Sequence, residues 1–240
     1  MSKKLKVFLG VSYLFILLIF LYFIFSNIEV SRLNDFLYYK ELQINLENFI
    51  GSNIYANLAL FFIFSIIWVT LLGFGSPLLI ISGILFGKWV GTLISVMSIS
   101  FGALMLYTIA NFFFAGLVQN IFKNKFSKYI NLFKKNEFYY FFVYRFVGGL
   151  GVPFGLQNIL PVIFNMKKFN YFFSSMLGFI PGFFVFNTLG AGLHNYIEKY
   201  ENFSFFKLIL APEIFFPILM FIILIILTLV IKNFFFTHVD

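Results

Sequence analysis

The chain has 240 residues, of which 61% are hydrophobic and 11% are charged, and it contains no cysteine. A soluble domain carries about 25% charged residues, so this composition indicates an integral membrane protein of one domain with a few spans. The lack of cysteine excludes disulfides, thiolate nucleophiles and cysteine-bound metals. The net charge is +8, but the cations lie between apolar runs. We therefore expect charge sorting across a bilayer and no nucleic-acid partner.

The first apolar run follows Lys3, Lys4 and Lys6 and covers the nineteen uncharged residues 7–25. A signal peptide has an apolar core of about 7–15 residues and a small-residue cleavage site. This run is longer and no good cleavage site follows it. We interpret it as an uncleaved span, with a cleaved signal peptide as the alternative.

A break interrupts the second apolar run, residues 48–87, which contains forty residues without a charge. Since one span needs about twenty residues, this run predicts two crossings or one deep hairpin. The punctuation Gly73-Phe74-Gly75-Ser76-Pro77 lies inside it. We expect residues 57–72 to descend into the bilayer and residues 78–86 to return, with Gly73, Gly75 and Pro77 forming the break.

A second break follows Arg145, the only charge in residues 138–166. A guanidinium at the centre of a membrane helix costs about 2.5–3.5 kcal/mol on insertion scales. The glycine cluster behind it ends in proline and cannot continue a helix. Its structural residues are Gly148, Gly149, Gly151 and Pro153. Broken backbone at membrane depth needs protein or a wet cavity around it, so we expect a re-entrant hairpin with arms of about ten residues. A full span over residues 146–166 is the alternative.

The distribution of charge favours hairpins at both breaks. With full spans at about residues 7–25, 92–117, 171–193 and 214–231 and a cytoplasmic N-terminus, eleven cations lie inside and five outside, while seven of nine acids lie outside. The positive-inside rule expects this bias. If residues 146–166 crossed fully, Lys167 and Lys168 would move outside. Both termini are therefore expected in the cytoplasm.

The two halves of the chain share a pattern that predicts an inverted repeat. Each has a Gly-x-Pro break, a short apolar arm, a basic residue and then a crossing. One span separates the hairpins, so they enter from opposite sides. Such repeats are typical of transporters. We predict an all-α integral membrane protein with inverted repeats, two re-entrant helical hairpins and about four full transmembrane spans. Residues 1–56 form an anchor span and external loop, 57–195 the repeat domain, and 196–240 an external loop, the last span and a short tail.

Candidate binding residues gather at the breaks. Ser76 before Pro77 fits an N-cap followed by proline at the first helical position, and Val152-Pro153 resembles it. The N-terminus of a helix carries about half a positive charge and suits an anion. Together with Arg145, the two helix starts predict a phosphate site near the midplane.

Other residues support this site or compete with it. Gln157 and Asn158 lie one turn into the second arm, where we expect them to donate hydrogen bonds. The prolines alternatively only turn the hairpins, and Arg145 alternatively snorkels to the cytoplasmic edge or binds carbonyls of the opposite hairpin. Four residues of the following span are assigned to helix packing or to a groove: Gly178, Pro181, Asn187 and Gly190.

The sequence lacks the residues that several kinds of catalytic chemistry require. No acid lies within a predicted membrane segment, and the chain has no metal-spaced cluster, no nucleophile beside a base and no P-loop. An intramembrane hydrolase needs such groups. We therefore expect no enzyme, no metal and no cofactor.

These motifs resemble the DedA and SNARE-associated Golgi protein (VTT domain) superfamily. The resemblance covers roughly residues 60–195 and rests on the stretch from Arg145 through Pro153 to Asn158, the Gly178-Phe179-Ile180-Pro181-Gly182 run, and Gly75-Ser76-Pro77. It implies two facing re-entrant hairpins, and movement of phospholipid or polyprenyl-phosphate lipid. Relatives linked to proton coupling have a carboxylate in the first hairpin; this chain has none there, which favours the Golgi-type branch.

Three functions follow as hypotheses. The first is a lipid translocator, a scramblase or flippase, with membrane lipids as partners, either an anionic phospholipid or a carrier lipid. The second is a secondary transporter of a small anion, and the third is a non-transporting scaffold. We expect a multi-pass protein of a bacterial inner membrane that can form a homo-oligomer.

Overall fold

The computed structural model describes residues 3–26, 41, 44–45, 48, 53–72, 74–123, 127–199 and 209–236. These residues form helices and short connections, and there is no strand among them. The main helices, in chain order, are α1 (Lys3–Ser26), α3 (Ile54–Leu72), α4 (Ser76–Lys123), α5 (Ser127–Lys135), α6 (Glu137–Phe146), α7 (Phe154–Ile159), α8 (Lys168–Lys199) and α10 (Pro212–Phe236). Two short 3-10 helices, η2 (Gly148–Gly151) and η3 (Leu160–Val162), flank α7. The predicted all-helical class is confirmed.

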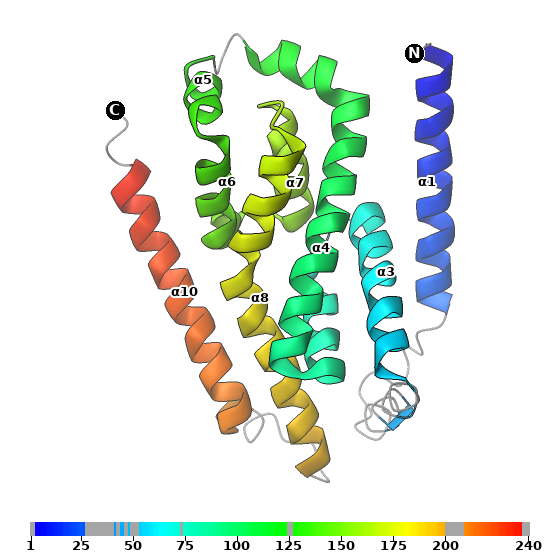
Figure 1. Ribbon diagram of the computed structural model, residues 1–240, viewed down its shortest axis with the longest axis vertical. Helices are drawn as coiled ribbons and strands as arrows, with labels where there is room; N and C mark the ends of the chain where they lie inside the picture. The colour runs from blue at the N-terminus through cyan, green and yellow to red at the C-terminus, as the bar shows by residue number, and fades with distance from the viewer. Residues whose placement is uncertain are drawn as a thin grey trace.

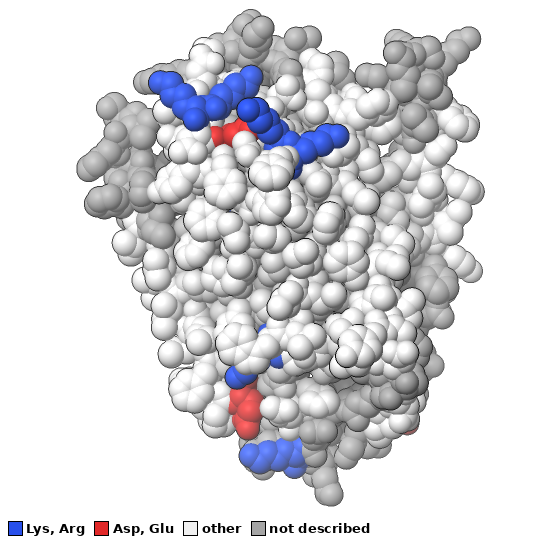
Figure 2. Space-filling model, viewed as in Figure 1, with Lys and Arg blue, Asp and Glu red and all other residues white. Residues whose placement is uncertain are grey.

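In the part of the chain that the structure describes, three helices are long and apolar enough to cross a membrane, through Ile54–Leu71, Ser76–Gly116 and Lys168–Tyr196. Shorter apolar stretches, Gly10–Tyr22 and Pro212–Leu227, lie in α1 and α10. On the face shown in Figure 2, charged side chains gather toward the two ends of the molecule and uncharged residues fill the broad band between them. This pattern suits a protein whose middle lies in hydrocarbon.

The chain first reverses at the turn between α3 and α4, and it reverses again within α4 at Gly87. The helical path of α4 is interrupted at Gly87, where φ is 71° and ψ is 177°. We call residues 76–86 the lower segment of α4 and residues 88–123 its upper segment. Glycine adopts a positive φ without the penalty that a Cβ brings, so Gly87 lets the chain turn back and start the long upper segment. The lower segment runs beside α3, and together they form what we call the first hairpin (Figure 1).

A further reversal, which forms the turn of a second hairpin, lies between α6 and α7. Gly148, Gly149 and Gly151 all have positive φ, between 72° and 81°, and η2 is the turn that they make. Beyond it α7 and η3 return toward the end where α6 began (Figure 1). We call α6 to η3 the second hairpin. Its two ends are joined because the Glu137 carboxylate accepts hydrogen bonds from the backbone N–H of Lys167.

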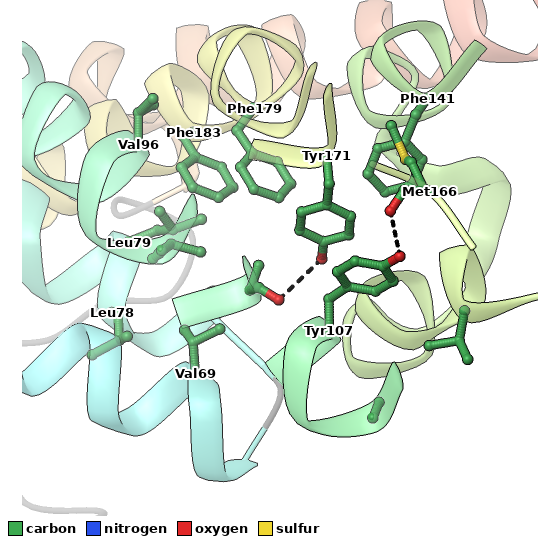
Figure 3. Close-up of a cluster of buried hydrophobic side chains, with 14 of the residues drawn as sticks. Val69, Leu78, Leu79, Val96, Tyr107, Phe141, Met166, Tyr171, Phe179 and Phe183 are labelled. Carbon is green, nitrogen blue, oxygen red and sulfur yellow. Dashed lines mark hydrogen bonds between the residues drawn. The ribbon is translucent and has the colours of Figure 1, made fainter. Parts of the chain in front are cut away.

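α8 is the central element. It packs most extensively against α4, and also against α6 and α10. A cluster of buried side chains from α3, α4, the second hairpin and α8 forms the main core (Figure 3). The start of α1 and the end of α10 lie at the same end of the molecule, on its two flanks (Figure 1).

Some predicted boundaries differ from the structure. α3 has 19 residues and is itself long enough to cross a membrane, whereas a shorter descending arm was expected. The return arm of the second hairpin is divided between α7 and η3 instead of being one helix. Pro161 begins this division, since proline has no N–H to donate to a helix and lies at the start of η3. Gly73 and most of the expected external loops lie outside the described residues.

Candidate functional site

The turns of the two hairpins meet beside one stretch of α4. A Cβ built on Gly75, in the first turn, would lie 3.3 Å from the side chain of Ile99 and 3.8 Å from the ring of Phe154 in the second hairpin. One helical turn further along α4, the carbonyl of Ala103 accepts a hydrogen bond from the Tyr171 hydroxyl. Gly75 therefore lies between the upper segment of α4 and the start of α7. Tyr171 of α8 contacts the same face of α4, since residues four apart lie on one face of a helix.

A pocket of about 120 Å³ lies between the two turns and α8. Its polar side chains are Ser76, Arg145 and Gln157, and the remainder of the lining is apolar or glycine. These other lining residues are Gly75, Leu79, Gly148, Phe154, Gly178, Phe179, Gly182, Phe183 and Phe186. The pocket therefore places one cation and two neutral polar groups in an aromatic wall.

Arg145 is buried, with 2% of its surface exposed. One terminal nitrogen donates to Gln157 Oε1 at 3.1 Å. The other donates to Asn158 Oδ1 at 2.6 Å and to the Tyr171 hydroxyl at 3.1 Å. All three partners are neutral, and they fix the orientation of the guanidinium. The side chain does not extend to the edge of the molecule, and these bonds do not involve carbonyls of the first hairpin.

Aromatic rings surround the guanidinium. Its central carbon lies 4.7 Å from the ring centroid of Phe141 and 4.8 Å from that of Phe179. The rings of Phe154 and Tyr171 follow at 5.6 and 5.8 Å. A cation within about 6 Å of a ring face is attracted by its quadrupole. The rings thus offset part of the cost of burying this charge without neutralising it.

The charge of Arg145 has no ionic partner in the described part of the chain. Its Nε–H finds no hydrogen-bond acceptor there, and the residue lines the pocket. A buried cation is costly unless it is paired, so an anion entering the pocket would meet a strong attraction. This arrangement can bind a phosphate or a carboxylate.

The structure gives some predicted site residues roles that differ from the expected ones. Gln157 and Asn158 were expected to donate hydrogen bonds to a ligand. Their side-chain oxygens accept from Arg145, and the Asn158 amide nitrogen has no acceptor among the described residues, so donation by Asn158 to a ligand stays a prediction. The Gln157 amide nitrogen donates to the carbonyls of Gly148 and Val152, which holds the turn closed. These two residues therefore position the arginine.

The two predicted helix starts differ in the length of the helix behind them. α4 starts at Ser76, which is exposed and lines the pocket, and Pro77 is its second residue. Pro153 is the N-cap of α7 and has no side-chain capping bond. Since α7 has only six residues, few peptide dipoles align behind its start. The guanidinium is the main positive charge of this pocket.

The four residues assigned to helix packing or a groove divide into two groups. A Cβ on Gly178 would overlap the Cβ of Arg145, so this glycine lets α6 and α8 approach at the site. Pro181 lies within α8, one residue before Gly182 of the pocket wall. Asn187 and Gly190 instead lie against the lower segment of α4.

The second group forms a buried polar contact between helices. Ser82 donates to the side-chain oxygen of Asn187 and also bonds Ser95 at 2.7 Å. Cβ atoms on Gly83 and Gly190 would overlap backbone atoms of the facing helix. Small residues let helix backbones approach closely, so this group holds α8 against α4 and does not line the pocket.

The sequence did not single out the aromatic residues around Arg145. Tyr171 donates to the carbonyls of Ala103 and Asn158 while it accepts from Arg145, and Figure 3 shows it pointing into the core beside Tyr107. Aromatic residues make up 23% of the chain, so no single one stands out. Only the position of Tyr171, shortly after the basic pair Lys167-Lys168, distinguishes it along the chain.

Comparisons with known proteins identify the domain that carries this pocket. No curated protein and no solved structure matched the chain. Residues 74–192 match the VTT domain, and this range includes both hairpin turns, Arg145 and most of α8. The helical fold, the apolar helices able to cross a membrane and this match agree: the chain belongs to the VTT-domain family, that of the DedA and SNARE-associated Golgi proteins, and is a membrane protein.

Proposed function

We propose that the protein translocates lipids that carry a phosphate headgroup. The observation that carries this proposal is the buried, unpaired guanidinium of Arg145, which faces a pocket between the two hairpin turns. The pocket is lined by Gly75 and Gly148 of the two turns, and Gly75 lies against Ile99, well inside the upper segment of α4 and away from either charged end. A phosphate bound there would be about half-way across the hydrocarbon.

The size of the pocket supports a headgroup as its occupant. A cavity needs at least about 10–15 Å³ to hold a single water, so a pocket of about 120 Å³ leaves room for a group as small as a phosphate. Two acyl chains cannot enter the same space. They would stay in the bilayer beside the exposed apolar side chains of α8 and α10, such as Leu177, Ile180 and Leu219.

The hairpins would be re-entrant and related by inversion. The turn of each lies deep in the molecule, and the ends of the first and second hairpins lie at opposite ends of it (Figure 1). Lys134, Lys135, Lys167 and Lys168 lie at the end where α1 starts, and Lys88 and Lys199 lie at the other. By the positive-inside rule the first of these ends is cytoplasmic, with both termini. The expected inner-membrane location stays part of this proposal.

A small-anion transporter is the second candidate, because inorganic phosphate would also fit the pocket. An enzyme is disfavoured, since Arg145 and its neutral partners supply neither a nucleophile nor a general base. Anionic phospholipid or a polyprenyl-phosphate carrier is the proposed partner.

The test is scrambling of a fluorescent phospholipid in proteoliposomes, read as the fraction that an external quencher bleaches. Wild type is expected to expose both leaflets, and Arg145→Ala only the outer one, at equal protein incorporation. Gly182→Leu is the second variant. No atom lies within 4 Å of a Cβ at Gly182, so leucine would fill the pocket and leave the arginine in place.

Lys88→Ala, at the start of the upper segment of α4, is the matched loss of a cation outside the pocket and should scramble like wild type. Full scrambling by both Arg145→Ala and Gly182→Leu would refute the proposal. Uptake of radioactive phosphate without lipid movement would favour the second candidate.

A further inference from the structure

A second cavity lies at the mouth of the second hairpin, at the end of the molecule where α5 lies. Its volume is about 370 Å³. The end of α5, the start of α6 and the start of α8 form its wall, and three lysines line it: Lys134, Lys135 and Lys167. Lys168 is also exposed and adjacent in sequence, but does not line the cavity.

The base of this cavity is an ordered polar group. Glu137 is 7% exposed, and its carboxylate accepts from the Lys167 backbone N–H at 3.2 and 3.3 Å. It also accepts from the Asn170 side chain at 2.6 Å, so it holds the start of α6 against the start of α8. A carboxylate at the first turn of α6 is also stabilised by the helix dipole. The wall of the cavity is therefore fixed, unlike a set of independent surface lysines.

Unusual backbone conformations shape the same wall. Asn165 has a φ of 48° and is the only residue other than glycine with positive φ in the described ranges. Asn136, which also lines the cavity, is the N-cap of α6 and makes no side-chain capping bond. Backbone strain is often concentrated where a binding site needs a particular shape. Here both chain reversals at the mouth of the hairpin leave their asparagine side chains exposed at the cavity.

The charged side chains that line the cavity favour an anion as its ligand. Three ammonium groups line the cavity against one carboxylate, and that carboxylate is already engaged by Lys167 N–H and Asn170. A metal ion would meet a single acidic ligand. Figure 2 shows the basic side chains around an acidic one at this end of the molecule.

The aromatic side chains around the cavity indicate that the anion belongs to a lipid. Phe138 lines the cavity itself. Next to it, Phe169 is 70% exposed, and Tyr139 and Tyr140 are exposed by 47% and 40%. Aromatic side chains are enriched at the level of lipid headgroups. The cavity thus opens where phosphates of the bilayer are concentrated.

We propose that this cavity binds the phosphate of an anionic lipid headgroup between Lys134, Lys135 and Lys167. Because Glu137 ties the cavity to both ends of the second hairpin, a bound lipid would brace the base of the hairpin whose turn carries Arg145. The site is separate from the Arg145 pocket, and the proposal does not depend on lipid translocation.

The test measures binding of phosphatidylglycerol to the purified full chain in neutral detergent, by native mass spectrometry. Lys167→Gln and Lys134→Gln are each expected to weaken binding about tenfold or more, because each removes a hydrogen bond to a charged group. Lys167→Gln leaves the backbone N–H that Glu137 uses. Lys168→Gln is the matched control and should stay within about twofold of wild type.

Further arms separate the sources of the anion. Phosphatidylcholine and inorganic phosphate should compete weakly, and Arg145→Ala should leave the lysine-dependent binding unchanged. Equal loss in Lys168→Gln would mean a diffuse attraction between the lipid and the basic surface and would overturn the proposal. So would equal competition by inorganic phosphate, or binding abolished by Arg145→Ala and untouched by Lys167→Gln. Melting temperatures of all variants establish that each is folded.

Discussion

The rings of Tyr107 and Tyr171 stack with their centroids 4.6 Å apart and their planes 9° apart. The Tyr107 hydroxyl donates to the Met166 carbonyl at 2.6 Å, just before α8 (Figure 3). The Tyr171 hydroxyl accepts from Arg145 at 3.1 Å. The pair therefore connects α4 to Met166, at the mouth of the second hairpin, and to Arg145, the charged side chain of that hairpin.

The first prediction separates the two members of this pair. Tyr171→Phe removes the hydroxyl that accepts from Arg145, so it should slow lipid scrambling at least tenfold and lower stability by about 1–3 kcal/mol. Tyr107→Phe removes a buried hydrogen bond of the same kind without touching Arg145. It should cost similar stability, measured by thermal unfolding in detergent, and keep most of the activity. Equal activity of the two variants would contradict the positioning role of Tyr171.

The second prediction concerns the close approach of α8 to α6. A Cβ on Gly178 would lie 2.5 Å from the Arg145 Cβ and 3.0 Å from the Phe142 carbonyl oxygen. Gly178→Ala should therefore destabilise the protein by about 1–3 kcal/mol, as overpacking does. Gly182→Ala, one turn along the same helix with open space around it, should be neutral or slightly stabilising. Melting temperatures of the two variants compare them directly, and a lower value for Gly182→Ala would contradict this account.

The third prediction uses two glycines of the η2 turn. Gly149 and Gly151 have φ values of 73° and 81°, so alanine at either costs about 1–2 kcal/mol. Only at Gly149 would the new Cβ also overlap the side-chain amide of Gln157. Gly149→Ala should therefore lose scrambling activity as well as stability, while Gly151→Ala loses stability alone. The prediction is wrong if both variants scramble lipid at the wild-type rate after the rates are corrected for the amount of folded protein.

The fourth prediction concerns the energy source. The charge in the Arg145 pocket comes from arginine, which stays protonated at any physiological pH, and no acid lies in residues 138–197. Scrambling rates should therefore agree within about twofold at pH 6 and pH 8, and with or without a pH gradient across the vesicle. Rates that follow the gradient would show a proton-coupled step, for which this pocket supplies no titratable group.

The sequence was a good guide to the places where helices are interrupted. Gly75 before Ser76-Pro77 and the cluster Gly148–Gly151 both coincide with turns in the structure, because proline and positive-φ glycine act through the local backbone. The helical class, the family and the apolar character were predicted for a similar reason. Each depends on composition or on short motifs that are complete within a few residues.

The tertiary structure alone decided how the buried charge is held. Arg145 was visible as a lone cation in an apolar run, but its partners Gln157, Asn158 and Tyr171 lie 12, 13 and 26 residues away. Whether an amide donates to a ligand or accepts from an arginine depends on which groups the fold brings within 3 Å. The same holds for the lysine cavity, whose walls come from residues 134–138 and 165–170. Local sequence determines where a chain bends, but long-range packing determines which polar groups are left to share one buried charge.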